Sequence, residues 1–164
     1  RVIGIAGGKE KCAWLTDELG LDAAIDYKSE DVAARLGALC PDGINVFFDN
    51  VGGAILEAAL EHLAMRGRVV LCGAISGYNE DESSRGPKNY FNLILKSGRM
   101  EGFLVLDFFP RAQEALQEMS GWVSSGKLKD RVDIAEGLEN APKALRRLFT
   151  GANLGKQLLK IAEP

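Results

Sequence analysis

Short apolar runs alternate along the chain with segments in which apolar residues recur every three or four positions. The first kind of segment is typical of buried strands, and the second of amphipathic helices. Four strands are predicted to begin near residues 2, 23, 44 and 68, each separated from the next by a helix. A spacing of about twenty residues fits right-handed crossovers through short helices. The pattern therefore predicts an α/β fold with a doubly wound, mostly parallel sheet.

The first three predicted helices each carry an apolar stripe: Cys12, Leu15 and Leu19; Val32, Leu36 and Leu39; Leu56, Leu60 and Leu63. Gly20 is expected to end the first helix, and Ser29 is expected to be the N-cap of the second. Arg66-Gly67 is expected to end the third helix before a fourth strand over Val69–Cys72.

Beyond the fourth strand the alternation becomes less regular. A long polar loop over Ala74–Lys88 is followed by a predicted short helix (Tyr90–Lys96) and a strand (Met100–Leu106). Pro110 is expected to start a longer helix, whose inward residues would be Ala112, Leu116, Met119 and Val123. A half-buried strand at Val132 and Ile134, a helix with Leu138, Leu145 and Leu148, and a strand over Lys156–Ile161 complete the prediction.

The strand Ile44–Phe48 ends at two short polar residues, Asp49 and Asn50, which two glycines follow closely. Glycine allows the backbone to turn sharply into the next helix. In an open α/β sheet, ligands bind in the crevice outside the carboxyl ends of the strands. Asp49 and Asn50 therefore lie where chemistry is expected.

Composition narrows the possible partners. The 164 residues carry a net charge of -3, and no long run of like charges suggests a nucleic-acid or membrane surface. Cys12, Cys40 and Cys72 are too far apart in sequence for a zinc site, and their odd number does not fit a disulfide framework. A reducing, cytoplasmic setting is therefore expected. His62 is the only histidine, which excludes a serine-histidine-aspartate triad and a multi-histidine metal site.

Three motifs follow one another in a characteristic order: Asp49-Asn50-Val51-Gly52-Gly53, then Cys72-Gly73-Ala74-Ile75-Ser76-Gly77-Tyr78, then Asn153-Leu154-Gly155-Lys156. The whole chain resembles the zinc-independent medium-chain reductases, which include prostaglandin/leukotriene reductases, alkenal double-bond reductases and bacterial curcumin-type reductases. The resemblance implies a Rossmann-like nucleotide-binding domain that is N-terminally truncated, without its first strand and glycine-rich turn. Residues 1–129 would be this partial domain, and residues 130–164 would pack on a catalytic domain absent from the chain.

The end of the first strand indicates the cofactor. NAD enzymes place an acid there to bind the ribose 2′-hydroxyl, whereas this chain has Gly7-Gly8 and a lysine, Lys11, in the first turn of the helix. Small residues and positive charge would accommodate a 2′-phosphate, so we expect NADP, and the family resemblance gives Lys11 this role. A solvated surface lysine is the alternative. The resemblance also places Tyr27 near the adenosine phosphate, although it could be a half-buried tyrosine with a hydrated hydroxyl.

Asn50 could donate and accept hydrogen bonds towards the ribose or nicotinamide, or it could bond its own backbone as a turn former. By resemblance, the other cofactor-binding residues are Cys72, Gly73, Ala74, Ile75, Ser76, Tyr78, Phe103, Leu104, Val105 and Asn153. The 72–78 segment would offer mainly backbone groups, and Cys72 itself is expected to be a small buried side chain. The side chains of Phe103, Leu104 and Val105 are expected to be core.

Tyr78 is the one residue that we nominate for catalysis. The family reaction adds hydride to the β-carbon of an enone, and a hydroxyl donor would stabilise the charge that develops on the carbonyl oxygen. Tyr78 could instead hold only the ribose hydroxyl. The strand Met100–Leu106 is expected to be the sheet edge through which this superfamily forms homodimers.

The resulting hypothesis is an NADPH-dependent reductase of α,β-unsaturated ketones or aldehydes, of which this chain is the cofactor-binding part. A dinucleotide-binding or assembly module without activity of its own is the alternative. A methyltransferase on a similar sheet would need an acid at the end of the first strand, where this chain has glycine. The physiological substrate is not encoded in these residues, because most of the substrate pocket would belong to the missing domain.

Overall fold

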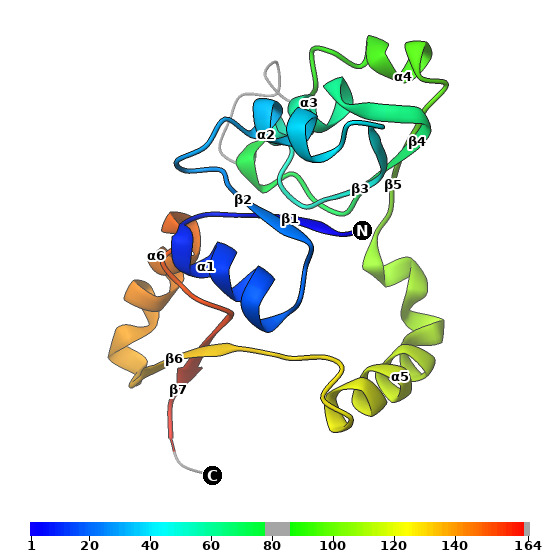
Figure 1. Cartoon of the computed structure of the whole chain (residues 1–164). Coiled ribbons are helices and arrows are strands. Elements are labelled where there is room, and N and C mark those ends of the chain that lie inside the picture. Colours follow the sequence, from blue (N-terminus) through cyan, green and yellow to red (C-terminus); the bar gives the residue numbers. More distant parts are fainter. Residues whose placement is uncertain (78–85, 163–164) are drawn as a thin grey trace. The chain divides into compact units, whose positions relative to one another are not determined.

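The structure is a computed structural model that describes residues 1–77 and 86–162 (Figure 1). The described chain forms two compact units, one made of residues 1–24 and 113–164 and the other of residues 25–112. We call them the terminal unit and the central unit. Mixed α/β structure with parallel strand pairs confirms the predicted fold class. The predicted boundary between residues 129 and 130 concerns packing on a further domain and stays a prediction.

The central unit is built around a parallel sheet in the order β3-β4-β5. Its strands are β3 (Ile44–Asp49), β4 (Leu63–Leu71) and β5 (Arg99–Gly102). The pairing register aligns Asp49 with Leu71 and Leu71 with Gly102. The carboxyl ends of all three strands therefore lie side by side, and the loops that leave them start from one edge of the sheet.

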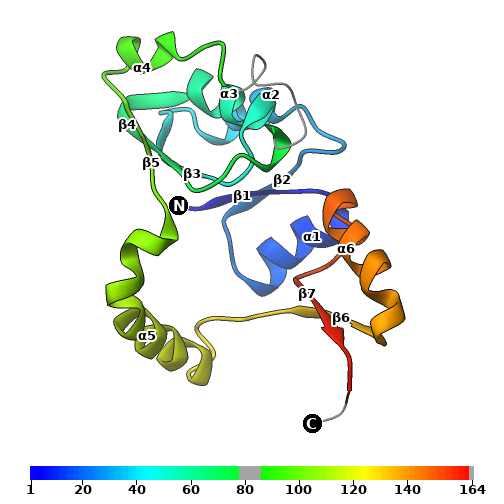
Figure 2. The ribbon, with the colours of Figure 1, turned by 180° about the vertical axis from the view of Figure 1, so that it is seen from behind.

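Helices pack on this sheet from one side. They are α2 (Val32–Leu39), α3 (Gly53–Glu61) and α4 (Phe91–Leu95), and Figures 1 and 2 show α2 and α3 next to each other. Leu56, Leu60, Leu63 and Val69 form the buried core, against which Phe47 packs. Val46 and Phe48, which alternate with Phe47 along β3, are more than half exposed in the described structure. The core therefore occupies one face of the sheet.

Two local predictions in the central unit were wrong. The N-cap of α2 is Asp31, whose carboxylate accepts the backbone N–H of Ala34 at 3.0 Å, whereas the hydroxyl of Ser29 donates to Asp26. Leu63 belongs to β4 rather than to the preceding helix, which ends at Glu61. Leu63 is nevertheless buried as predicted, because apolar burial is compatible with either element.

The segment after β4 also differs from the prediction. A 3-10 turn, η2 (Ile75–Gly77), precedes the residues that are not described, and β5 ends at Gly102 rather than at Leu106. The chain then forms a second 3-10 segment, η4 (Val105–Arg111). Strand pairing stops at Gly102 because β4, its partner, ends at Leu71 in the same register.

The terminal unit joins the two ends of the sequence. Its N-terminal part contains β1 (Ile3–Ala6), α1 (Lys9–Ala13) and a π-helical turn, η1 (Trp14–Glu18), before β2 (Ala23–Asp26), which pairs with β1. Its C-terminal part contains α5 (Ala112–Ser124), β6 (Val132–Glu136), η5 (Leu138–Asn140), α6 (Ala141–Thr150) and β7 (Lys156–Lys160). β6 and β7 form a parallel pair.

The predicted inward face of α5 is not buried in the described structure. Leu116, Met119 and Val123 are each at least 40% exposed. Their spacing nevertheless forms one apolar face of the helix, as predicted. The amphipathic pattern was recognised correctly, but the described residues do not cover the face.

Candidate functional site

The Asn50 turn, residues 49–53, connects β3 to α3 in the central unit. Asp49 is only 2% exposed, and its Oδ1 atom accepts the backbone N–H groups of Val51 at 2.8 Å and Gly52 at 3.0 Å. Gly52 has φ 73° and ψ -154°, a conformation that is essentially restricted to glycine. Asp49 therefore makes the side-chain bond that shapes the turn, while the side chain of Asn50 is exposed.

Backbone hydrogen bonds join this turn to the segment after β4. The carbonyl of Asp49 accepts N–H groups from Cys72 at 2.8 Å and Gly73 at 3.2 Å. The Val51 carbonyl accepts both the N–H of Ser76 at 3.0 Å and its hydroxyl at 2.6 Å. The structure thus brings Asn50 together with residues 72–76, two groups of predicted cofactor residues that are distant in sequence.

The close approach of the two segments explains their small residues. A Cβ atom on Gly53 would lie 2.9 Å from the hydroxyl oxygen of Ser76, and Gly53 has φ 56°. Cys72 is exposed, so the prediction of a buried side chain was wrong. Its side chain lies beyond the end of β4, where the sheet no longer covers it.

The predicted residues after β5 reach the same edge of the sheet. The N–H of Phe103 donates to the Leu71 carbonyl at 3.2 Å, and its ring lies 6.2 Å from that of Phe48 and 5.8 Å from that of Phe108, between centroids. Leu104 and Val105 are more than 60% exposed, so the expectation of core side chains was wrong for these two. They follow the end of strand pairing at Gly102, which leaves them without a neighbouring strand.

Of the two tyrosines that were predicted to bind the cofactor, Tyr27 lies within the described residues and Tyr78 does not. Tyr27 follows β2 in the central unit, and its side chain is 45% exposed. The buried carboxylate of Asp26 shapes this turn by accepting the N–H of Lys28 at 3.0 Å and the hydroxyl of Ser29 at 2.8 Å. Tyr78, the nominated catalytic residue, lies outside the described residues.

In the terminal unit, Lys11 contacts the start of the loop that contains Asn153, although the two lie near opposite ends of the sequence. The Nζ atom of Lys11 donates to the carbonyl of Gly151 at 2.7 Å, and Lys11 is only partly exposed. Gly151 begins the Asn153 loop, residues 151–155, in which the side-chain amide of Asn153 donates to the Gly155 carbonyl at 2.8 Å. Lys11 is therefore held against the backbone and is not a freely solvated surface lysine.

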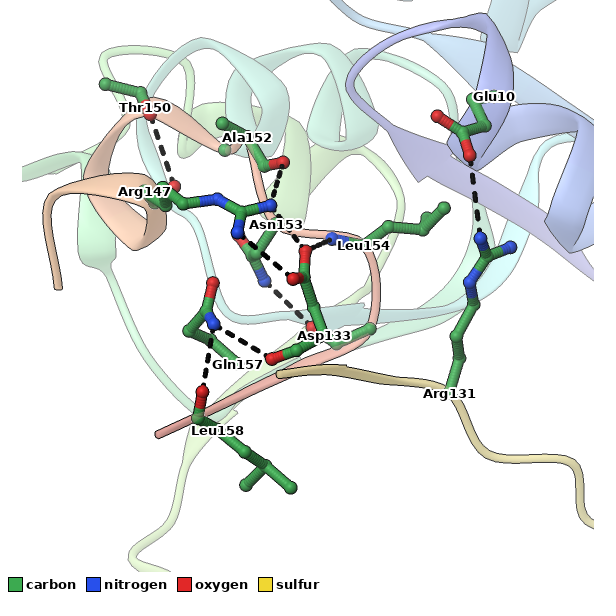
Figure 3. Close-up of polar contacts among 12 residues, drawn as sticks. Glu10, Arg131, Asp133, Arg147, Thr150, Ala152, Asn153, Leu154, Gln157 and Leu158 are labelled. Atoms are coloured by element: carbon green, nitrogen blue, oxygen red, sulfur yellow. Dashed lines mark hydrogen bonds and ion pairs between the residues drawn. The ribbon is translucent and has the colours of Figure 1, made fainter. Parts of the chain in front are cut away.

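A polar cluster that the sequence analysis missed surrounds the Asn153 loop (Figure 3). The guanidinium of Arg147 pairs with the carboxylate of Asp133 at 2.6 Å, and the N–H of Leu154 donates to the same carboxylate at 3.1 Å. The Leu154 N–H, followed by the charge of Arg147, lowers the pKa of Asp133 below its usual value of 3.8. A signal existed in the sequence, since Asp133 is the polar position between two apolar residues of a predicted strand.

The same cluster borders a concave surface within the terminal unit. A cavity of about 410 Å³ is lined by Asp133, Arg147, Arg131 and Glu10, among others. Arg131 and Glu10 form a longer ion pair, with 3.6 Å between nitrogen and oxygen (Figure 3). Both arginines at this cavity thus face carboxylates of the same unit.

Metal and membrane features were also sought in residues 1–77 and 86–162. Within these ranges no three His, Cys, Asp or Glu side chains gather closely enough to hold a metal ion. Within the same ranges, no helix combines the length and apolarity that crossing a bilayer requires. His62 is the C-cap of α3, and its ring lies beside Gly37 of α2. This packing between two helices is consistent with a structural role for His62.

Comparison with known proteins places these features in a family. The zinc-binding dehydrogenase profile matches residues 19–159. The chain is 44% identical to the NADP(+)-dependent 2-alkenal reductase of Nicotiana tabacum over 98% of its own length and 47% of that protein. It is 38% identical to the NADPH-dependent curcumin reductase of Escherichia coli, over 99% of its own length and 48% of that protein.

A solved structure agrees with these relatives. The crystal structure of CurA from Vibrio vulnificus in complex with NADPH has a TM-score of 0.90 and 40% identity, and the match covers all of this chain and 50% of that one. The chain spans about half the length of the relatives it matches. Because the family profile covers most of its residues, the chain belongs to the zinc-binding dehydrogenase family, within a fold that is Rossmann-like.

Proposed function

We propose that this chain is the cofactor-binding part of an oxidoreductase that transfers hydride from NADPH to the double bond of an α,β-unsaturated ketone or aldehyde. The observation that carries the proposal is the junction of the Asn50 turn with residues 72–76 at the carboxyl ends of β3 and β4. Dinucleotides bind at this position in open α/β sheets. The alkenal and curcumin reductases among the relatives support the substrate class.

The residues at this edge suit a dinucleotide. Glycines at positions 52 and 53 leave the backbone accessible, and the exposed amide of Asn50 can both donate and accept. The bound cofactor would supply the hydride, as nicotinamides do in this class of chemistry. The chain's own contribution would be to hold and orient the nicotinamide half with Asn50, Phe103 and residues 72–76. We further propose that the reaction does not require zinc.

Lys11 and Asn153 are further candidate cofactor contacts, and both belong to the terminal unit. An ammonium group has three N–H donors, and Lys11 uses one of them on the Gly151 carbonyl. The remaining donors could bind a 2′-phosphate, and Tyr27 would bind near the same end of the cofactor. Tyr78 would donate its hydroxyl to the substrate carbonyl or to the ribose. A Tyr78→Phe variant with unchanged kcat and a raised KM for NADPH would leave only the ribose role.

The choice between NADPH and NADH tests the proposal most directly. Calorimetric titrations would use the 164-residue chain and the full-length gene product. We expect Lys11→Ala to raise the dissociation constant for NADPH by about 10- to 100-fold, with little effect on NADH, because the variant loses a charge-assisted bond to the 2′-phosphate. Lys9→Ala, two positions earlier in the same helix, is the matched control and should change neither constant.

Equal weakening of NADPH and NADH binding by Lys11→Ala would contradict the phosphate role. If the full-length gene product bound neither dinucleotide, the oxidoreductase proposal would fail. Binding without turnover of any enone or enal would instead support the second candidate, a dinucleotide-binding or assembly module. The exposed apolar side chains of Val46 and Phe48 favour that candidate, because exposed apolar side chains on a sheet are typical of surfaces that bind a partner.

Two further expectations belong to this proposal. A homodimer would form at the open edge of β5, near residues 100–106, since β5 pairs only with β4 among the described strands. Light scattering would reveal a monomer if this is wrong. A cytoplasmic location would suit Cys12, Cys40 and Cys72, which are present as thiols, and a reporter fusion that located the protein outside the cytoplasm would contradict it.

A further inference from the structure

The Asn153 loop has a backbone that few other residues could form. It begins at Gly151, the C-cap of α6, with φ 63°, and it ends at Gly155, with φ 85°. A Cβ atom on Gly155 would collide with the carbonyl oxygen of Arg131. Glycine is therefore favoured at both ends of the loop, because both have a positive φ angle. The residues between the two glycines are positioned by side-chain contacts.

Arg147 and Asp133 hold the loop on both sides of Asn153 (Figure 3). The Nη1 and Nη2 atoms of Arg147 donate to the two carboxylate oxygens of Asp133 at 3.1 and 2.6 Å. Nη2 also donates to the carbonyl of Ala152 at 3.3 Å, and the N–H of Leu154 donates to Asp133. The residues before and after Asn153 are thus bonded to one ion pair.

The ion pair between Arg147 and Asp133 is bidentate and partly buried. The two parallel N–H···O bonds fix the plane of the guanidinium relative to the carboxylate. The side chains of Arg147 and Asp133 are 33% and 17% exposed, so solvent competes only in part. Gln157 adds a bond to the backbone carbonyl of Asp133 at 2.8 Å. The pair is therefore held by more contacts than a single-bonded, fully exposed ion pair would be.

We propose that Asp133 and Arg147 are positioning residues for cofactor binding, which act by fixing the Asn153 loop so that the side chain of Asn153 faces the cofactor. The inference rests on the proposed function, because it takes Asn153 as a cofactor contact. It adds two residues that do not themselves touch the cofactor.

Asp133→Asn tests this role, because it keeps the shape of the side chain and removes its charge. In the full-length gene product, we expect the variant to raise the NADPH dissociation constant about tenfold and the amide exchange rate of Leu154 about tenfold, as for the loss of one charge-assisted hydrogen bond. Glu136→Gln is the matched control in the same strand. Glu136 is exposed, and the change should leave both quantities unchanged.

A double-mutant cycle separates positioning from general stability. If Asp133 acts through Asn153, adding Asp133→Asn to Asn153→Ala should weaken NADPH binding by less than about twofold beyond the single Asn153 variant. Arg147→Lys should reproduce the effect of Asp133→Asn, because lysine keeps the charge but cannot form the bidentate contact. Additive effects in the cycle, or unchanged NADPH binding in both variants, would overturn the inference. No NADPH binding by the parent protein would refute the proposed function as well.

Discussion

Two turns that present predicted cofactor residues are fixed by different means. In the Asn50 turn, Asp49 accepts backbone N–H groups two and three positions further along the chain. In the Asn153 loop, Asp133 binds an N–H 21 positions away and an arginine 14 positions away. A short stretch of sequence can thus specify the first turn by itself, whereas the second requires the ends of separate elements to meet.

Loss of the buried carboxylate at the Asn50 turn should have the largest effect. Asp49→Ala would leave two backbone N–H groups without their acceptor, so we expect the free energy of unfolding to fall by about 3 kcal/mol. Asp49→Asn keeps one oxygen acceptor and should lose about half as much. Urea unfolding monitored by circular dichroism would measure both. Asp42→Ala in an exposed turn is the control, and a similar loss there would show that Asp49 has no special role.

The conformation of Gly52 gives a smaller expected effect. Gly52→Ala would place a side chain at φ 73° and ψ -154°, and we expect it to lower the free energy of unfolding by about 2 kcal/mol. Gly121→Ala is the matched control in the middle of α5, where no atom lies within 4 Å of the added Cβ. That change should stabilise the protein by about 0.5 to 1 kcal/mol. Equal effects of the two substitutions would show that the Asn50 turn does not require its glycine.

The Asp133 ion pair should have the smallest effect on stability, with a recognisable pH dependence. The pKa of Asp133 is lowered from 3.8 in the folded chain, so its ionised form stabilises the fold. This contribution is fully present above the unfolded pKa and is lost as the pH falls through the lower, folded pKa. The difference in Tm between the parent and Asp133→Asn should therefore be constant from about pH 5 to 7 and shrink below pH 3.8. A difference that grew on acidification would contradict this sign.

The contrast between the two turns also explains which parts of the molecule the sequence could predict. Asp49 and Asn50 were located because a buried strand, two polar residues and two glycines are adjacent in sequence. The role of Asp133 was missed because its partners, Arg147 and Leu154, lie in other elements. For Asn50, the sequence left open a self-bonded turn, and the structure assigns that bond to its neighbour Asp49.

The same distinction applies to the fold. The alternation of strands and helices and the apolar stripes follow from periodicity, and the parallel β3-β4-β5 sheet agrees with that pattern. The early end of β5 and the exposure of Leu116 depend on neighbours that periodicity does not specify. The N-cap position was missed because Asp31 and Ser29 are both good capping residues; in the structure Asp31 accepts the N–H of Ala34, while Ser29 donates to Asp26.

The bond between Lys11 and Gly151 joins positions that are 140 residues apart. A chain made from its N-terminus towards its C-terminus cannot form that bond until nearly all of these residues have left the ribosome. Closing so long a loop also adds an entropic cost that only the finished terminal unit can offset. The proposed phosphate-binding lysine would therefore gain this backbone contact only after Gly151 has been synthesised and has folded into the terminal unit.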